Sequence, residues 1–380
     1  MIYFDNAATS HPKPGGVGKA IASCLESGIG NPGRSGHALA LKAARLVFSA
    51  RETLAGFFNI PDCGRLAFTQ NATHALNAAI HGILRPGDHV LTTAMEHNSV
   101  MRPLHFLKQA GVIDYTAVPC PATGQSDPGE FVKAVRPDTK LIVINHASNV
   151  CGAIQPVAEI KRLLPDIPLL LDAAQSAGSL ALDVQAAGID MLAFSGHKGL
   201  MGPTGTGGLY VRRGIELAPL MQGGTGSRSE SLDHPGFLPD LLEAGTANVH
   251  GIAGLAAAVK FLEETTIAKI RQKEMRLTGI LLEGLGLIPG VTIYGPKDAE
   301  RQTATIAINL KDQDPADVAL RLDREYGICT RASLHCAPLA HRTLGSYPQG
   351  SIRLSLGYFN TEEEVSTCVK ALEAITRTGS

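Results

Sequence analysis

Four short polar motifs directly follow apolar runs of the kind that form buried β-strands. They are residues 68–73 (FTQNAT), 145–149 (NHASN), 172–175 (DAAQ) and 195–198 (SGHK). In open α/β sheets, ligands bind beyond the carboxyl ends of the strands. The four motifs therefore predict one shared site to which several strands contribute.

A lysine beside serine and histidine at a strand end is unusual. One interpretation of Lys198 is a Schiff base to an aldehyde cofactor, with an amine pKa lowered by its surroundings. The alternative is an ordinary exposed loop lysine. Asp172 favours the first, because a carboxylate can keep the pyridine nitrogen of pyridoxal phosphate protonated, although aspartate also caps helices. Together the two residues predict a pyridoxal-phosphate site.

A phosphate group needs hydrogen-bond donors and a helix amino terminus. Ala72 and Thr73 open a predicted helix, and Ser195 and His197 can add a hydroxyl and an imidazole. A simple helix cap is the alternative for Thr73. The chain has neither a Gly-Lys-Ser/Thr loop nor a Gly-x-Gly-x-x-Gly turn, which disfavours nucleotide cofactors.

Three further residues have side chains suited to such a site. His97 follows a strand, where its ring can stack on a cofactor or act as an acid or base, although a lone histidine is more often structural. Cys336 lies in a loop of the C-terminal region, where the alternative is a small buried hydrophobe. Arg353 on a strand suits a substrate carboxylate, and a surface ion pair is the alternative.

Apolar runs alternate with helical periodicity through the first two thirds of the chain. The runs at 140–145, 169–172 and 191–195 show no polar alternation, which predicts a mainly parallel sheet buried under helices on both faces. Other strands are expected at 65–69, 89–93, 303–309, 327–331 and 351–356, and helices at 72–84, 98–109, 248–285, 315–325 and 361–376. The fold class is therefore α/β, a large domain followed by a smaller α+β C-terminal domain.

Composition narrows the class of protein. The 380 residues include 34 basic and 35 acidic side chains, so no strongly basic face is expected for nucleic acid or an anionic membrane. No apolar run approaches the ~18 residues of a membrane span, and the amino terminus lacks a signal-peptide pattern. Seven cysteines without a Cys-x-x-Cys pair argue against disulfides and zinc, and favour the cytoplasm.

Together these motifs resemble those of the pyridoxal-phosphate-dependent cysteine desulfurases of the class V aminotransferase group. The likeness runs from residues 3–8 (YFDNAA) to 357–361 (GYFNT), and its most specific motifs include 172–175, 195–198, 243–246 (EAGT) and 335–337 (HCA). It implies the fold-type I architecture with a seven-stranded sheet. It also implies an N-terminal segment (1–15) packing near the small domain, a large cofactor-binding domain (16–255), and a connecting helix with the small domain (256–380).

The resemblance also implies residue roles. Lys198 would form the Schiff base, Asp172 would hold the pyridine nitrogen, and Cys336 would accept the sulfur. The phosphate would lie at Ala72, Thr73, Ser195 and His197, with Thr246 reaching the phosphate of the neighbouring subunit in a homodimer. The remaining contacts would be ring stacking by His97, the ring hydroxyl by Gln175, the ring oxygen and substrate by Asn149, and the substrate carboxylate by Arg353.

The expected reaction removes sulfur from L-cysteine, giving L-alanine and a persulfide on Cys336. A sulfur-acceptor protein, for iron–sulfur cluster or thio-cofactor assembly, is the expected partner. His97, His335 or another nearby cation should favour the Cys336 thiolate. The alternatives are L-selenocysteine as substrate, C–S lysis or transamination on the same scaffold, and a non-catalytic sulfur-transfer scaffold. The short spacing from Cys336 to Arg353 resembles the branch with an ordered cysteine loop.

Overall fold

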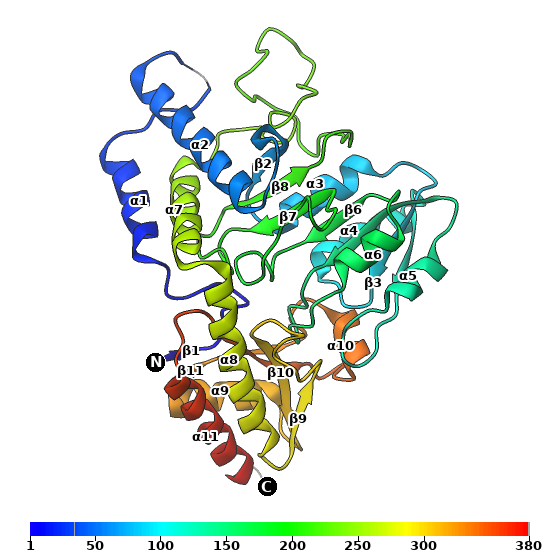
Figure 1. The fold of residues 1–380 in the computed structure, drawn as a ribbon, viewed down its shortest axis with the longest axis vertical. Coiled ribbons are helices and arrows are strands. Elements are labelled where there is room, and N and C mark those ends of the chain that lie inside the picture. Colours follow the sequence, from blue (N-terminus) through cyan, green and yellow to red (C-terminus); the bar gives the residue numbers. More distant parts are fainter. Residues whose placement is uncertain (34, 379–380) are drawn as a thin grey trace.

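A seven-stranded sheet forms the centre of the larger part of the molecule (Figure 1). The computed structural model describes residues 1–33 and 35–378. β8 pairs antiparallel with β2 and with β7, and the other four pairings of this sheet are parallel, so the expected mainly parallel, seven-stranded sheet is confirmed. The strand order is β2 (Leu66–Thr69), β8 (Gly207–Val211), β7 (Met191–Ser195), β6 (Leu169–Asp172), β5 (Thr139–Asn145), β3 (His89–Thr93) and β4 (Asp114–Val118).

Helices bury both faces of this sheet, which explains its uninterrupted apolar strands. In β5, Leu141 and Val143 join the core under α3 (Ala72–Ile83) and α4 (Asn98–Gln109). Ile142 and Ile144 point the other way, because successive strand residues face opposite sides of a sheet. The core on that second face is completed by residues of α1 (Gly15–Glu26), α2 (Ala38–Phe57), α5 (Pro128–Ala134), α6 (Val157–Leu163) and α7 (Val249–Thr265).

Strand register brings the predicted polar motifs to one edge of the sheet. Asn145 pairs with Asp172, which on its other side pairs with Ala193. Ser195, two residues further along β7, pairs with Gly207 at the start of antiparallel β8. The residues that end β5, β6 and β7 therefore meet at the same place.

The long helix expected at 248–285 is two helices. Thr266 has a φ of 69°, which ends α7, and its hydroxyl then caps α8 (Ile267–Gly286). The first helix packs on α1 and α2, whereas α8 packs on α11 (Glu362–Thr378) beside the second sheet (Figure 1). The boundary expected at residue 256 falls inside α7, and the division into domains stays a prediction.

The C-terminal part is built on a four-stranded antiparallel sheet. Its order is β12 (Arg331–Ser333), β13 (Ser351–Ser355), β10 (Thr305–Leu310) and β9 (Val291–Tyr294), and three of its helices are α9 (Pro315–Tyr326), α10 (Pro338–Leu344) and α11. The single strand expected at 327–331 is divided. Its first half, β11 (Ile328–Cys329), pairs with the N-terminal β1 (Ile2–Tyr3), and the second half enters the four-stranded sheet as β12.

The N-terminal segment connects both parts of the molecule. Asn6 donates from Nδ2 to the carbonyl of Ser355 at 3.0 Å, and the Ala7 amide donates to the Ser355 hydroxyl at 2.9 Å. A few residues further, the Ser10 amide donates to the carbonyl of His197, next to the predicted lysine. Residues 5–10 thus lie between the small sheet and the functional edge of the large one.

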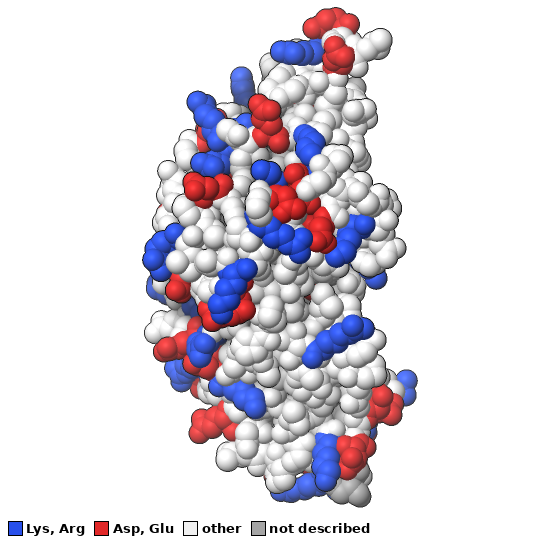
Figure 2. All heavy atoms as spheres, turned by 90° about the vertical axis from the view of Figure 1, so that its right-hand side faces the viewer, with Lys and Arg blue, Asp and Glu red and all other residues white. Residues whose placement is uncertain are grey.

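Surface charge is mixed. On the face shown in Figure 2, basic and acidic side chains are interspersed, in keeping with a formal net charge of −1. No helix within residues 1–33 and 35–378 is both long and apolar enough to cross a membrane.

Gly178 should be intolerant of a side chain. Its φ is +91°, and a Cβ there would lie 2.1 Å from the carbonyl oxygen of Gly199, beside Lys198. We expect Gly178→Ala to lower the free energy of unfolding by about 3 kcal/mol or more, through overpacking and left-handed backbone strain.

Gly279 provides the matched control, because it lies inside α8 with open space around the position of a Cβ. Gly279→Ala should raise the free energy of unfolding by up to about 1 kcal/mol. Urea unfolding of both variants measures the difference, and equal stability would contradict the packing argument.

Candidate active site

A cavity of about 220 Å³ opens at the carboxyl ends of the large sheet's strands. All of the predicted site residues line it except Thr246, Cys336 and Arg353. The sheet register described above accounts for this convergence, since the lining motifs follow β2, β3, β5, β6 and β7. A polar pocket at this position suits a small phosphorylated ring compound.

Lys198 and Asp172 form the charged centre of the cavity. Burial lowers the pKa of Lys198 to about 8, against an opposing effect of Asp172, which favours the ammonium form. Burial also raises the pKa of Asp172, whereas the Ala174 amide, which donates to its Oδ1 at 2.9 Å, and Lys198 both lower it. A lysine in this state is partly unprotonated near neutral pH and can act as a nucleophile.

Hydroxyl groups and a helix terminus make up one end of the cavity. Asn71 caps α3 by accepting from the His74 amide, and Ser195 Oγ accepts from the Ala72 amide at 3.0 Å. The Thr73 hydroxyl lies 2.7 Å from that of Ser99, on α4. Backbone dipoles and hydroxyls so arranged are suited to a phosphate.

His97 is the N-cap of α4. Its Nδ1 accepts from the Ser99 amide at 3.0 Å, so this nitrogen is unprotonated. Burial, together with Lys198 and nearby arginines, lowers the pKa of His97 to about 4. The ring is therefore a neutral imidazole and not a cation. It is free to stack on a planar group.

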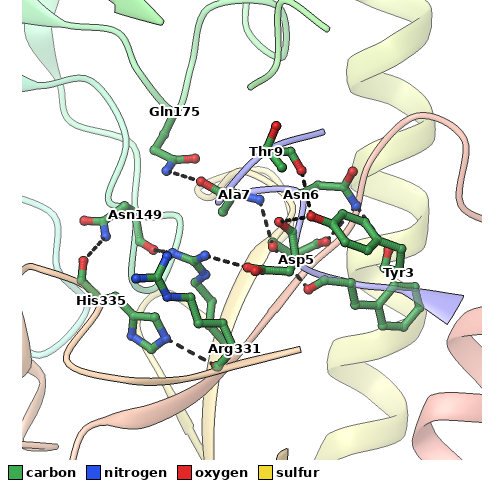
Figure 3. A network of polar contacts seen from close by, with 12 residues as sticks. Tyr3, Asp5, Asn6, Ala7, Thr9, Asn149, Gln175, Arg331 and His335 are labelled. Atoms are coloured by element: carbon green, nitrogen blue, oxygen red, sulfur yellow. Dashed lines mark hydrogen bonds and ion pairs between the residues drawn. The ribbon is translucent and has the colours of Figure 1, made fainter. Parts of the chain in front are cut away.

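Two amide side chains that line the cavity, those of Gln175 and Asn149, each donate a hydrogen bond to a main-chain carbonyl (Figure 3). Gln175 donates from Nε2 to the Ala7 carbonyl at 3.0 Å, which fixes the orientation of its amide group. Asn149 donates to the His335 carbonyl at 2.7 Å, and its buried Oδ1 has no hydrogen-bond partner among the described residues. Both side chains are thus held by main-chain groups from other parts of the chain.

Arg353 lies behind the cavity, on β13. Its side chain is buried and donates to Asp5 Oδ1 at 2.7 Å and to the Asn149 carbonyl at 3.0 Å. Asp5 counters the effect of burial on the pKa of Arg353. The guanidinium is close enough to lower the pKa of both Lys198 and His97, which puts it within electrostatic reach of the site.

Cys336 is exposed at a second, more open cavity of about 520 Å³, which shares Thr73, His97 and Ser99 with the first. Its carbonyl accepts from the Asn98 amide at 2.8 Å, at the start of α4. The thiol is near enough to Lys198 to affect the pKa of that amine. The structure thus brings the predicted nucleophile to the mouth of the predicted cofactor site.

Thr246 lies apart from the other predicted residues. It lines a third cavity of about 460 Å³, together with Gln70, Gly205 and Asn248. The expectation that Thr246 serves a neighbouring subunit stays a prediction.

The expected cationic histidine beside Cys336 is not present. Burial lowers the pKa of His335 to about 2, so this ring, like that of His97, is neutral. The charged groups that reach this region are Arg331 and Arg353, which lower the pKa of Lys198 as well as that of His335. Desolvation of the histidines, which their types alone do not reveal, accounts for the difference.

Sequence reasoning missed three residues of the site. Ser99 bridges Thr73 and His97 through its hydroxyl, and its place in the first turn of the helix predicted at 98–109 could have revealed it. Asp5, the ion-pair partner of Arg353, is 348 residues away from it, and no local pattern links the two. Arg331 carried no signal beyond its place in an expected strand.

Comparisons with known proteins agree with this geometry. The family model for class-V aminotransferases matches residues 2–368. A probable cysteine desulfurase from Methanothermobacter thermautotrophicus is 37% identical, over 100% of this chain and 95% of that protein. A cysteine desulfurase from Yersinia pestis is 31% identical, over 99% of this chain and 93% of that protein.

Solved structures give the same result. The apo structure of a cysteine desulfurase from Thermococcus onnurineus superposes with a TM-score of 0.92 at 32% identity, covering 100% of this chain and 95% of that one. A cysteine desulfurase from Escherichia coli gives a TM-score of 0.88 at 28% identity, covering 99% of this chain and 94% of that one. With its fold, site and full-length similarity in agreement, this chain belongs to the cysteine desulfurases of the class-V aminotransferase family.

Proposed function

We propose that this protein uses pyridoxal phosphate to remove sulfur from L-cysteine, leaving L-alanine and a persulfide on Cys336. The observation that carries this proposal is the convergence of Lys198 and Asp172 in one cavity with Cys336 at its mouth. An activated amine, a buried carboxylate and an accessible thiol are the three groups that such a reaction requires.

The residues of the cavity fit pyridoxal phosphate. Asn149 Oδ1 and His197 Nδ1 are buried without a hydrogen-bond partner among the described residues, so polar positions remain for a ligand. Lys198 would hold the aldehyde carbon and Asp172 the pyridine nitrogen, while the start of α3 with Thr73 would hold the phosphate. When bound, the cofactor supplies an electron sink that weakens the bonds at the substrate's α-carbon.

Three side chains of this site would have separate roles toward the substrate. Lys198 would be the base that takes the substrate's α-proton at its Nζ, because burial keeps its pKa near 8. Burial raises the pKa of Asp172, and the Ala174 amide and the nearby Lys198 oppose this effect by favouring its ionised form. Arg353 supplies positive charge for the substrate carboxylate, which would compete with Asp5 for the same guanidinium.

Sulfur transfer follows from the position of Cys336. Its thiolate attacks the substrate sulfur, so that an S–S bond forms as the substrate's Cβ–S bond breaks. The electron pair of the broken bond stays on the organic fragment, which takes up a proton and leaves as alanine. No external oxidant is required, because the two sulfur atoms are oxidised to a persulfide while the substrate's Cβ is reduced to a methyl group.

We also propose that two copies of the chain form a homodimer in which Thr246 reaches the cofactor phosphate of the partner subunit. Support comes from the cavity that Thr246 lines, which is separate from the chain's own cofactor site. The persulfide would then pass to an acceptor protein in a reducing cytoplasm, a setting consistent with seven cysteines that are all free. L-Selenocysteine is the alternative substrate for the same attack geometry.

Cys336→Ala should abolish alanine formation from L-cysteine while the protein keeps the yellow colour of bound cofactor. The physical reason is that the thiol accepts the sulfur but does not line the cofactor cavity. Cys329→Ala, at a half-buried cysteine of β11 away from the cavities at Lys198 and Cys336, is the matched control and should keep full activity.

Product analysis with L-cysteine and L-selenocysteine side by side measures the effect. Full activity of Cys336→Ala would overturn the nucleophile assignment, and release of free sulfide by this variant would favour C–S lysis. Retained transamination would favour an aminotransferase.

Cofactor uptake should depend on pH through Lys198. Because only the neutral amine attacks an aldehyde, a pKa of about 8 predicts that the uptake rate rises roughly tenfold from pH 7 to pH 9 and then levels off. An ordinary lysine would give a rate that continues to rise above pH 10. Stopped-flow absorbance of the cofactor-free protein mixed with pyridoxal phosphate measures this profile.

Asp172→Asn tests the cause of this pH dependence. Asp172 raises the pKa of Lys198, so its removal should move the midpoint of the profile to lower pH. An unchanged midpoint would contradict the electrostatic coupling between the two residues.

A further inference from the structure

Behind the Cys336 segment, two histidines and a serine form a buried chain of hydrogen bonds. His335 Nδ1 lies 3.3 Å from His341 Nε2, and His341 Nδ1 lies 2.7 Å from the hydroxyl of Ser346. At the other end, His335 Nε2 lies 3.3 Å from the carbonyl oxygen of Arg331. All three side chains are buried, with relative exposures of 3%, 0% and 4% for His335, His341 and Ser346. This side-chain set is called the His335–Ser346 relay below.

The direction of the relay is determined at one end. A carbonyl can only accept, so His335 carries its proton on Nε2 and presents Nδ1 as an acceptor. His341 must then donate from Nε2, which leaves its Nδ1 to accept from the Ser346 hydroxyl. Every bond in the relay therefore points toward Arg331, and each imidazole has a single allowed tautomer.

Neutral rings are a condition of this arrangement. Burial lowers the pKa of His341 to about 4 and that of His335 to about 2, so neither ring carries the second proton that would break the pattern. The two rings lie nearly parallel, at 19°, with centroids 5.4 Å apart.

Local structure explains how the three residues meet. His341 lies on α10, and Gly345 ends this helix in the left-handed region with a φ of 80°. The reversal returns Ser346 beneath His341, where its amide also donates to the His341 carbonyl at 2.9 Å. The relay is thus built into the end of α10, directly after the Cys336 segment.

The segment that the relay supports is strained. Ser333, His335 and Cys336 have φ values of 135°, 48° and 56°, a region that costs a residue other than glycine about 1–3 kcal/mol. Such a backbone persists only where its surroundings determine it. Here the His335 side chain points inward to the relay and its carbonyl accepts from Asn149 (Figure 3), while the Cys336 side chain is exposed at the cavity mouth.

We propose that His341 and Ser346 are positioning residues for sulfur transfer: Ser346 fixes the tautomer of His341, whose hydrogen bond to His335 holds Cys336 in its strained conformation beside the cofactor cavity. This inference rests on the proposed function, because it concerns the thiol that accepts the sulfur. Neither residue lines the Lys198 cavity or the cavity at Cys336. The relay also ends on the backbone of Arg331, so it fixes the two ends of the segment from Arg331 to Cys336 together.

The test compares two pairs of variants in the cofactor-loaded protein. His341→Leu removes the donor to His335, whereas His341→Gln places an amide N–H at nearly the same position. Ser346→Ala lets His341 adopt the other tautomer, which would set two acceptor nitrogens against each other, and Ser346→Thr restores the hydroxyl. The control for loss of a histidine elsewhere is His105→Leu, on the exposed side of α4.

Persulfide formation on Cys336 in a single turnover, followed by mass spectrometry, is the first readout. We expect His341→Leu and Ser346→Ala to slow it by about 10- to 100-fold, the loss that a displacement of about 1 Å causes in a reacting group. His341→Gln and Ser346→Thr should recover most of the rate. Substrate binding, monitored by the change in cofactor absorbance on adding L-cysteine, should stay within about threefold, since the relay lies outside that cavity.

The second readout is the histidine tautomer, measured by long-range proton–nitrogen NMR correlation on histidine-labelled protein. Wild-type His335 and His341 should both carry the proton on Nε2, and Ser346→Ala should give a mixture at His341. This measurement keeps the inference testable if His341→Leu does not fold, because the serine variants change only one small side chain.

The possible failures are distinguishable. If wild-type protein forms no persulfide from L-cysteine, the proposed function fails. If wild-type protein forms the persulfide and Ser346→Ala forms it equally fast, only the positioning role is overturned. A Ser346→Ala rate that falls without recovery in Ser346→Thr would also overturn it, since the loss would then reflect general disruption of the segment.

Discussion

The rest of the structure depends on one constraint: the carboxylate of Asp172 is buried at the end of a central strand and must be stabilised there. An ion taken out of water is destabilised by several kcal/mol unless an opposite charge and hydrogen bonds compensate. Asp172 accepts a hydrogen bond from the Ala174 amide and lies near Lys198. Asp172 and Lys198 each stabilise the ionised form of the other. The apolar strands β5, β6 and β7 exclude water from this pair, and their parallel register brings it to the open edge of the sheet.

Around this pair, the site keeps its other titratable groups in one protonation state. His97, His197 and His335 are all neutral, because burial lowers the pKa of each ring to about 4 or below. The permanent positive charges come from arginines, of which Arg353 is paired with Asp5. Among the described residues that line the cavity, Lys198 is the basic group whose pKa is lowered to about 8, a value suited to proton transfer near neutral pH.

The sequence was most informative about features that depend on the residues of a single helix or strand. The strands ending at Asn145, Asp172 and Ser195 are continuous apolar runs, so both their type and the polar residues after them could be predicted. The prediction of one long helix at 248–285 was wrong, because the helical periodicity of the sequence continues through Thr266, whereas the backbone there turns to positive φ. The ion pair of Asp5 with Arg353 could not be predicted from the sequence, since partners 348 residues apart leave no local pattern. The neutral state of His335 depends on burial, a property of the folded chain.

The hydrogen bonds made by residues 5–10 have a consequence for how the enzyme is made. Asn6 is bonded to a residue 349 positions later, and the same short segment, through Thr9 and Ser10, donates to the carbonyl that precedes Lys198. During synthesis residues 5–10 are translated more than 300 residues before their partners on β13. The lysine loop therefore acquires its final support only when the end of the small sheet has left the ribosome, and contacts this distant in sequence form late. The edge of the large sheet that carries Lys198 is therefore complete only after the small sheet, and with it the segment that contains Cys336, has been translated.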